Sequence, residues 1–271
     1  CGWAPIEAGK TMGLFPYGQQ NLKIPDIYTD YDGMSDWSTT NRDLIVPTYP
    51  NGAVVNYGRF TELRNPPSLG VGDDLTKLQS RRDMAYAIQT ESEQMVLDLI
   101  RKAVKMSGEK NVVLSGGYGL NCVANYWYLE QLKDEGINLF VEPVSNDAGT
   151  AIGAAYWHYQ KVSKSTKVHP QIKDLYYGPK YEYDTEYIKD LASYYNATRI
   201  FEATHEDAVD LISKKNIVAM FQGKSESGPR ALGNRSIMYD PRDPKGKDHV
   251  NTIKRREYFR PFAGSILKEH V

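Results

Sequence analysis

The chain has 271 residues, 41% of them hydrophobic and 25% charged, and a formal charge of −1 from 33 basic and 34 acidic side chains. This length and composition predict one large or two ordinary globular domains and exclude a largely disordered chain. The near-neutral charge excludes a global attraction to nucleic acid or to an anionic membrane, so anion binding requires a local patch. No run approaches the roughly 18 apolar residues of a bilayer span, and the N-terminus lacks a signal-peptide core, so we expect a cytoplasmic protein without membrane contact.

The cysteines and the two ends of the chain carry separate expectations. Cys1 and Cys122 are the only cysteines, and their spacing fits a reducing compartment better than a disulfide or a metal site. Cys122 directly follows GGYGLN and is expected to be a small buried side chain. The chain starts with Cys instead of Met and ends just after FAGSIL, an apolar run typical of a strand, so both ends are expected to be cuts within a longer protein.

The first part of the chain predicts a loop, an irregular region and one long helix. Residues 1–18 are punctuated by Gly and Pro and are expected to form a loop, while residues 19–80 lack a sustained period and are expected to hold short strands around VVNYG. Apolar residues recur at steps of three and four over residues 84–106, which predicts a helix that ends at Gly108.

Two strand–turn–helix units follow. Residues 111–114 are short, apolar and β-branched, and they lead through SGG into a helical pattern after Asn121. LFVEPV at residues 139–144 predicts a second strand, followed by the turn SNDAGT and a small-residue helix over about residues 148–162. Parallel strands joined by helices indicate an α/β region.

Residues 163–180 lose periodicity and gain Ser, Lys, Pro and Gly, as expected of a boundary. We therefore predict a first domain over residues 1–165, a linker over 166–180 and a second domain over 181–271. The second domain is expected to contain helices near residues 184–195 and 206–214 and a strand over 217–221, with Thr204 and Asp207 forming a capping box at the second helix.

Two turns and one basic segment carry the candidate chemistry. Gly116 and Gly117 lie at a strand-to-helix turn whose backbone N–H groups can meet a phosphate, and Asn121 can add a side-chain donor. Taken alone, this pattern favours glycines that serve close packing. Asp147, beside Gly149, can offer a carboxylate to a divalent metal, although a helix-capping role is the simpler interpretation of one acid without a second ligand.

The basic segment contains several cations among Gly and Pro residues, and GPRALGNRS carries no acid, which a solvated charged face would normally include. Arginine forks bind phosphates in two-pronged geometry, so this segment predicts a phosphate site. Its cations are Lys224, Arg230, Arg235, Lys254, Arg255, Arg256 and Arg260.

Six ordered segments resemble the NodU/CmcH-type O-carbamoyltransferases across nearly the whole chain: KTMGLFPYG at 10–18, LSGGYGLNCVAN at 114–125, VEPVSNDAGTAIGAA at 141–155, FQGKSESGPRALGNRSI at 221–237, DPRDP at 240–244 and FRPFAGSIL at 259–267. The resemblance implies the second lobe of an actin-like, sugar-kinase-like ATPase domain followed by a YrdC-like α/β domain, both incomplete. It also implies a reaction in which carbamoyl phosphate and ATP form carbamoyladenylate, whose carbamoyl group passes to a hydroxyl acceptor with the help of bound iron, Mg²⁺ accompanying ATP.

The resemblance also implies roles for individual residues. Asp147 would be a metal ligand, and Lys224 replaces the arginine usual in the family's QGR. Nucleotide contacts would come from Gly116, Gly117, Asn121, Gly149 and Arg235. Catalytic contacts to carbamoyl phosphate and the ATP phosphates would come from Lys224, Arg230, Lys254, Arg256 and Arg260.

One departure concerns the metal site. The family's HxxxH motif is absent, and the five histidines show no such pairing, so Asp147 would lack partners unless the missing N-terminal part, in the same or a separate chain, supplies them. The expected acceptor is a small hydroxyl-bearing molecule such as a sugar, antibiotic or nucleoside. Two alternatives are an enzyme like the tRNA threonylcarbamoyl transferases, disfavoured by the near-neutral charge, and an inactive binding or assembly fragment.

Overall fold

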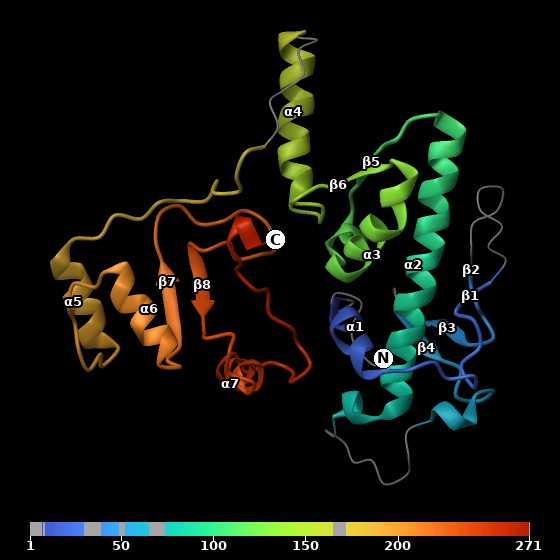
Figure 1. The fold of residues 1–271 in the computed structure, drawn as a ribbon, viewed down its shortest axis with the longest axis horizontal. Coiled ribbons are helices and arrows are strands. Elements are labelled where there is room, and N and C mark those ends of the chain that lie inside the picture. Colours follow the sequence, from blue (N-terminus) through green and yellow to red (C-terminus); the bar gives the residue numbers. More distant parts are fainter. Residues whose placement is uncertain are drawn as a thin grey trace. The chain divides into compact units, whose positions relative to one another are not determined.

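The computed structural model describes residues 7, 9–29, 39–48, 52–64, 74–164 and 172–270. The chain divides into two compact units, Cys1–Ser145 and Asn146–Val271. Each unit combines helices with two-stranded sheets, so the expected α/β class is confirmed (Figure 1). The actin-like and YrdC-like assignments stay predictions. Across the residues that the structure describes, no helix combines the length and the apolar character that a bilayer crossing requires.

The first unit is organised by one long helix, α2, which runs beside every sheet of the unit in Figure 1. The strand pairs β1–β2 and β3–β4 are antiparallel, whereas β5 and β6 are parallel. In chain order the elements are α1 (Gly9–Leu14), β1 (Tyr28–Thr29), β2 (Thr39–Thr40), β3 (Ile45–Thr48), β4 (Gly52–Val55), α2 (Gln79–Ser107), β5 (Asn111–Leu114), α3 (Cys122–Leu132) and β6 (Asn138–Val141).

The predicted strand–turn–helix unit is confirmed in β5, α3 and β6. Side chains alternate along both strands, so that Val112 and Leu139 pack toward α2 and α3 while Val113 and Phe140 face away. The inner face meets a buried cluster from the two helices, completed by Ile137. The members of this cluster are Leu97, Ile100, Ala124, Tyr128, Leu132 and Ile137.

The N-terminal segment corrects the expectation of a loop. Residues 9–14 form α1, and a 3₁₀ turn follows at Phe15–Tyr17. Gly18 then approaches α2 so closely that a Cβ there would lie 2.1 Å from the carbonyl oxygen of Arg82. Asp83, buried in α2, accepts hydrogen bonds from the backbone of Gln19 and the side chain of Asn21. The segment is therefore ordered by tertiary contacts that composition does not show.

In the described part of the second unit, three α-helices precede the sheet and one α-helix follows it. The sheet is an antiparallel pair in which Phe221 lies opposite Arg235. The helices near 184–195 and 206–214 and the strand near 217–221 are confirmed within one or two residues, whereas β8 and α7 were not predicted. The elements are α4 (Gly149–Ser163), α5 (Thr185–Tyr194), α6 (His205–Ser213), β7 (Val218–Phe221), β8 (Arg235–Met238) and α7 (Gly246–Ile253).

An aromatic group covers part of the sheet of the second unit. The rings of Tyr181 and Tyr183 lie 6.2 and 5.9 Å from the ring of Phe221, and Tyr183 stacks on Tyr187 of α5 at 5.6 Å. All four rings keep substantial solvent exposure. Among the described residues of 146–271, the buried apolar side chains are Val250 and Phe259. This unit consequently has a much smaller core than the first.

Two further sequence expectations are wrong. Residues 262–267, expected to form a strand, have no regular secondary structure, because no described strand pairs with them. Cys122 is exposed instead of buried, since it occupies the outer side of the first turn of α3, with its Sγ 4.0 Å from Sδ of Met12.

Candidate active site

The loop between β7 and β8 holds the sequence GKSESGPRALGN and is closed at its base by Asn234. The carbonyl of Asn234 accepts from the N–H of Gln222 at 3.1 Å, and its side-chain amide donates to the carbonyl of Lys224 at 2.7 Å. Because both bonds cross the base, the two ends of the loop are held together as an extension of the strand pair.

Glu226 lies in the same loop and accepts hydrogen bonds from the backbone at the end of the loop that leads into β8. Its Oε1 accepts from the backbone N–H groups of Leu232 (2.8 Å), Asn234 (2.8 Å) and Arg235 (3.2 Å). Partial burial raises the pKa of Glu226, but these N–H groups and its own N–H outweigh burial and lower the pKa to about 2. The carboxylate is therefore ionised and compensated by peptide dipoles.

Residues 175–180, assigned to a linker by composition, hold the loop from outside. Ser227 N–H donates to the carbonyl of Leu175 at 2.6 Å, and Gly178 and Ser225 are joined through the Gly178 N–H at 3.0 Å. A Cβ at Gly178 would lie 1.9 Å from Oγ of Ser225, so this approach requires glycine. Tyr176 completes the contact by donating to the carbonyl of Leu232 at 2.9 Å.

The predicted cations of this loop fall into two groups. The guanidinium of Arg235 lies 3.6 Å from the ring centroid of Phe221 and donates to the carbonyl oxygens of Gln222 and Gly223. Its donors are thus largely used inside the protein. Lys224 and Arg230 are exposed, and within the described ranges neither side chain has a partner. These two cations are free to meet an anion.

The second basic segment follows α7 and is organised by Asn251, which is 2% exposed. Its amide nitrogen donates to the carbonyls of Tyr258 (3.2 Å) and Arg260 (3.1 Å), and its Oδ1 accepts from Nε of Arg256. The guanidinium of Arg256 also lies 4.1 Å from the ring centroid of Phe262. Asn251 therefore folds residues 256–260 back against the end of α7.

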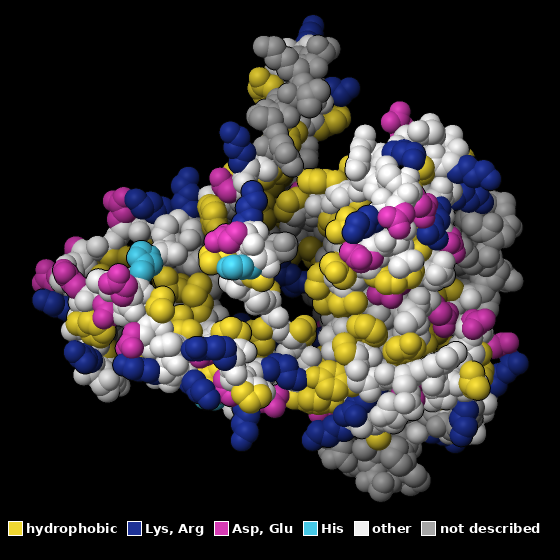
Figure 2. Space-filling model, viewed as in Figure 1, with side chains coloured by type: hydrophobic (Ala, Val, Ile, Leu, Met, Phe, Trp, Pro, Cys, Tyr) yellow, Lys and Arg dark blue, Asp and Glu magenta, His cyan; other side chains and the backbone are white. Residues whose placement is uncertain are grey.

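The remaining predicted cations of this segment differ in their surroundings. Arg260 Nε lies 3.4 Å from Oε2 of Glu257, so this side chain is ion-paired. Lys254 is exposed and has no partner among the residues that the structure covers. Among the residues coloured in Figure 2, Lys and Arg side chains are interspersed with Asp and Glu side chains within each unit. Phosphate binding would accordingly depend on individual loops.

The turn between β8 and α7 contains a buried acid. Asp240, 4% exposed, accepts from the backbone N–H, Nε and Nη2 of Arg242 at 2.7–3.1 Å. The Arg242 side chain and backbone hold the pKa of Asp240 at about 2. Glu226, Asn251 and Asp240 were all missed as site residues. The available signal was that all three are polar residues between Lys224 and Arg260, the limits of the predicted basic segment.

In the first unit the predicted GG turn has an open backbone. Gly116 has φ +99°, which favours glycine, and Gly117 starts a 3₁₀ helix, Gly117–Leu120. Both residues are exposed, and in the described part of the chain neither N–H has an acceptor. This geometry leaves two backbone donors available to an anion.

Asn121 contributes to that turn differently from the prediction of a nucleotide donor. Its Oδ1 accepts from Ala124 N–H as the N-cap of α3, and its amide exchanges hydrogen bonds with buried Gln89 at 3.0 and 3.2 Å. Gln89 also donates to Glu93 at 2.7 Å, and burial raises the pKa of Glu93. The Asn121 side chain therefore belongs to a polar network with Gln89 and Glu93 of α2.

Asp147 and Gly149 lie at the start of α4. The simpler interpretation of Asp147 as a cap is wrong, because Ala148 is the N-cap and no side chain caps this helix. The Asp147 carboxylate is exposed, and Gly149 donates its N–H to the carbonyl of Asn146 at 3.0 Å. Among the described residues, no group of three or more His, Cys, Asp or Glu side chains can hold a metal ion.

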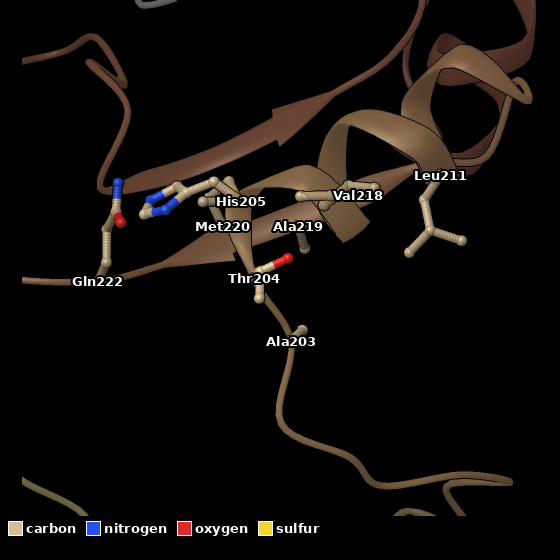
Figure 3. Close-up of a pocket in the computed structure, with 9 residues that line it drawn as sticks. Ala203, Thr204, His205, Leu211, Val218, Ala219, Met220 and Gln222 are labelled. Carbon is tan, nitrogen blue, oxygen red and sulfur yellow. The ribbon is translucent and has the colours of Figure 1, made fainter.

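A pocket lies between α6 and β7 of the second unit (Figure 3). Its walls combine apolar side chains with the polar groups of Thr204, His205 and Gln222, and none of the predicted site residues lines it. Gln222 links its edge to the basic loop, since the Gln222 amide donates to the carbonyl of Gly233 at 3.3 Å.

Two family models match the chain. The model for the carbamoyltransferase N-terminus matches residues 4–156, and the model for the carbamoyltransferase C-terminus matches residues 209–271. The chain belongs to the carbamoyltransferase family. The second match contains both halves of the basic segment, from Lys224 to Arg260.

Relatives of this carbamoyltransferase chain extend over almost all of it. An uncharacterized protein of Synechocystis is 36% identical over 97% of the chain and 43% of its own length. Nodulation protein NolO of Bradyrhizobium diazoefficiens is 33% identical over 99% of the chain and 46% of its own length, and nodulation protein NolNO of Sinorhizobium fredii is 34% identical over 99% and 37%. The chain thus spans less than half the length of these relatives.

The family's implied iron does not fit the described residues of this carbamoyltransferase chain by themselves. Asp147 is an exposed carboxylate without a neighbouring ligand among them, and one oxygen ligand does not define an iron site.

Proposed function

We propose that this chain is part of an ATP-dependent O-carbamoyltransferase. In this proposal residues 181–271 form carbamoyladenylate from carbamoyl phosphate and ATP, and residues 1–165 take part in transferring the carbamoyl group to a hydroxyl acceptor, with AMP as the leaving group. Family membership supports carbamoyl transfer, and the β7–β8 loop supports the phosphate chemistry.

One observation carries the phosphate assignment. The β7–β8 loop is held by backbone, Glu226 and Asn234 while Lys224 and Arg230 remain exposed. Donors that are already in place lose less freedom when an anion binds, and cations near a reacting phosphate stabilise its developing charge. A rigid loop that presents two unpaired cations has the features that a phosphoryl-binding site needs.

The proposed chemistry has two steps. Water cleaves carbamoyl phosphate to carbamate and inorganic phosphate; a carbamate oxygen then attacks the α-phosphorus of ATP, forming carbamoyladenylate as pyrophosphate leaves. Lys224, Arg230 and Lys254 would bind the phosphoryl oxygens, hold the reactants in line and offset the charge of the leaving group. Arg235 and Arg256 would support the backbone of the two basic segments.

The test measures carbamoyl-phosphate-dependent release of pyrophosphate from ATP by the whole carbamoyltransferase. Arg230→Ala should reduce this rate at least about a hundredfold, the size expected when a cation that stabilises transition-state charge is lost. The matched control is Arg199→Ala, which removes an exposed arginine of the same unit that lies over Phe201 and should retain the rate. Absence of pyrophosphate release by the unaltered protein would refute the proposed function.

The first unit is proposed to bind nucleotide or carbamoyladenylate at the GG turn. The open N–H groups of Gly116 and Gly117 support this role, whereas the Asn121 amide would act by fixing the start of α3. Metal-assisted transfer would need ligands beyond Asp147, and these are proposed to come from another part of the carbamoyltransferase.

The sheet of the first unit supports a partner of that kind. Parallel sheets are normally covered on both faces, yet Val113 is 66% and Phe140 43% exposed on the outer face of β5–β6. We propose that another part of the whole carbamoyltransferase covers this face.

A further inference from the structure

Glu226 is an acid in the middle of a loop whose other charged side chains, Lys224 and Arg230, are basic. An unpaired carboxylate there would repel a phosphate. The structure accounts for it through geometry: one carboxylate oxygen accepts three backbone N–H groups, from Leu232, Asn234 and Arg235. Hydrogen bonds from N–H groups to an ionised oxygen are stronger than those between neutral groups.

These contacts hold one part of the loop and leave another free. Glu226 precedes the segment 227–231, and its three donors follow or adjoin the end of that segment. The carboxylate therefore ties the two sides of residues 227–231 together, while Ser227 N–H is bound to the carbonyl of Leu175. Arg230, within the tied segment, keeps an exposed side chain.

Among the described residues, the Glu226 carboxylate forms no ion pair with a cation of the loop. Arg235 donates its backbone N–H to Glu226, but its guanidinium donates to the carbonyls of Gln222 and Gly223 and lies over the ring of Phe221. The hydrogen bonds of the Glu226 carboxylate are made to backbone N–H groups. The guanidinium of Arg230 is consequently not paired with Glu226 and is available to a ligand.

We propose that Glu226 is a positioning residue for carbamoyl phosphate: it holds segment 227–231 in the conformation that presents Arg230 to the phosphoryl group. The proposal rests on the proposed function. It concerns a residue that does not touch the substrate and acts through the backbone of the loop.

The experiment compares Glu226→Ala, which removes the acceptor, with Glu226→Gln, whose amide oxygen can accept the same N–H groups. Both are measured in the whole carbamoyltransferase by carbamoyl-phosphate-dependent pyrophosphate release. Glu226→Ala should raise KM for carbamoyl phosphate roughly tenfold or more, and Glu226→Gln should stay within about threefold of the unaltered protein. The matched control is Glu182→Ala. Glu182 is an exposed acid paired with Lys180 at 3.5 Å, and its loss should leave KM for carbamoyl phosphate unchanged.

The outcomes separate the possible failures. A merely structural defect would lower the active fraction, and hence kcat, with KM for carbamoyl phosphate unchanged; that result, or equal effects of the Ala and Gln variants, would overturn the positioning role. If Glu226→Ala does not fold, Glu226→Asp decides: its carboxylate is one methylene shorter, so a raised KM supports the proposal and an unchanged KM overturns it. An inactive unaltered protein would instead refute the proposed function.

Discussion

Asn251 shows how much of the second basic segment depends on one uncharged side chain. It is buried, and its amide satisfies the carbonyls of Tyr258 and Arg260 while accepting from Arg256. Removing a buried partner leaves these groups unsatisfied. The cations of this segment therefore owe their backbone geometry to an amide.

Asn251→Ala should destabilise the protein by about 2–4 kcal/mol, because the partly buried carbonyls of Tyr258 and Arg260 lose their donor and a buried side chain is deleted. Urea unfolding of the variant and the unaltered protein measures the difference. Asn216→Ala is the control: the Asn216 amide donates to the carbonyl of Leu211 at the exposed end of α6, so its loss should cost less than about 1 kcal/mol. Equal effects of the two variants would contradict the role of Asn251 in holding residues 256–260 against α7.

Acid should weaken the second unit through Glu226 and Asp240. Both carboxyls have pKa values of about 2, below their ordinary values of 4.5 and 3.8, so their stabilising contribution is complete above the ordinary values and is lost as pH falls through 2. Urea unfolding between pH 5 and 2 should show this loss. In Asp240→Asn, which cannot titrate, the decline should be shallower; an unchanged slope would contradict the assignment.

At the scale of elements, local signals predicted α2 to α6 and the strands β5, β6 and β7, but they missed α1, α7 and β8. The periodicity over 84–106 found α2, but the helix begins at Gln79, since Asp83 and its partners near Gly18 stabilise an additional N-terminal stretch. β8 was missed because four residues that include Arg235 and Ser236 carry no apolar alternation, and the pairing with β7 defines this strand.

The capping box of α6 is a local signal that the structure confirms. Thr204 accepts from Asp207 N–H, and the Asp207 carboxylate accepts from Thr204 N–H. Thr204→Ala should lower the free energy of unfolding by about 1 kcal/mol, since it leaves an N-terminal N–H without its acceptor. Urea unfolding followed by circular dichroism measures the loss, and Ser213→Ala at the other end of α6 should cost less. A larger loss for Ser213→Ala would contradict the cap.

For the molecule as a whole, both hydrophobic clusters of the described residues lie in the first unit. The second unit relies more on hydrogen-bonded loops around Glu226, Asp240 and Asn251. The apolar core thus lies mainly in the first unit and the candidate phosphate-binding loops lie in the second. The effect of a core substitution on stability can therefore be measured separately from the effect of a loop substitution.

Leu97→Ala tests that division. Leu97 is 1% exposed in the cluster between α2 and α3, so the truncation should cost about 2–5 kcal/mol of unfolding free energy. Val209→Ala, at a 65% exposed position of α6, should change it by less than about 0.5 kcal/mol. Calorimetry checks both values, and a small effect of Leu97→Ala would show that this cluster does not support the fold.

The sequence by itself determined the α/β class, the principal helices and, through six ordered motifs, membership of the carbamoyltransferase family. It also located the cation-rich segments, because residue type and spacing are written along the chain. Only the tertiary structure decided which cations serve the fold and which stay free. Arg235 and Arg256 meet carbonyls and rings brought to them by chain folding, whereas Lys224, Arg230 and Lys254 meet none within the described residues. That distinction depends on which groups lie within hydrogen-bonding reach, and spacing along the chain does not specify it.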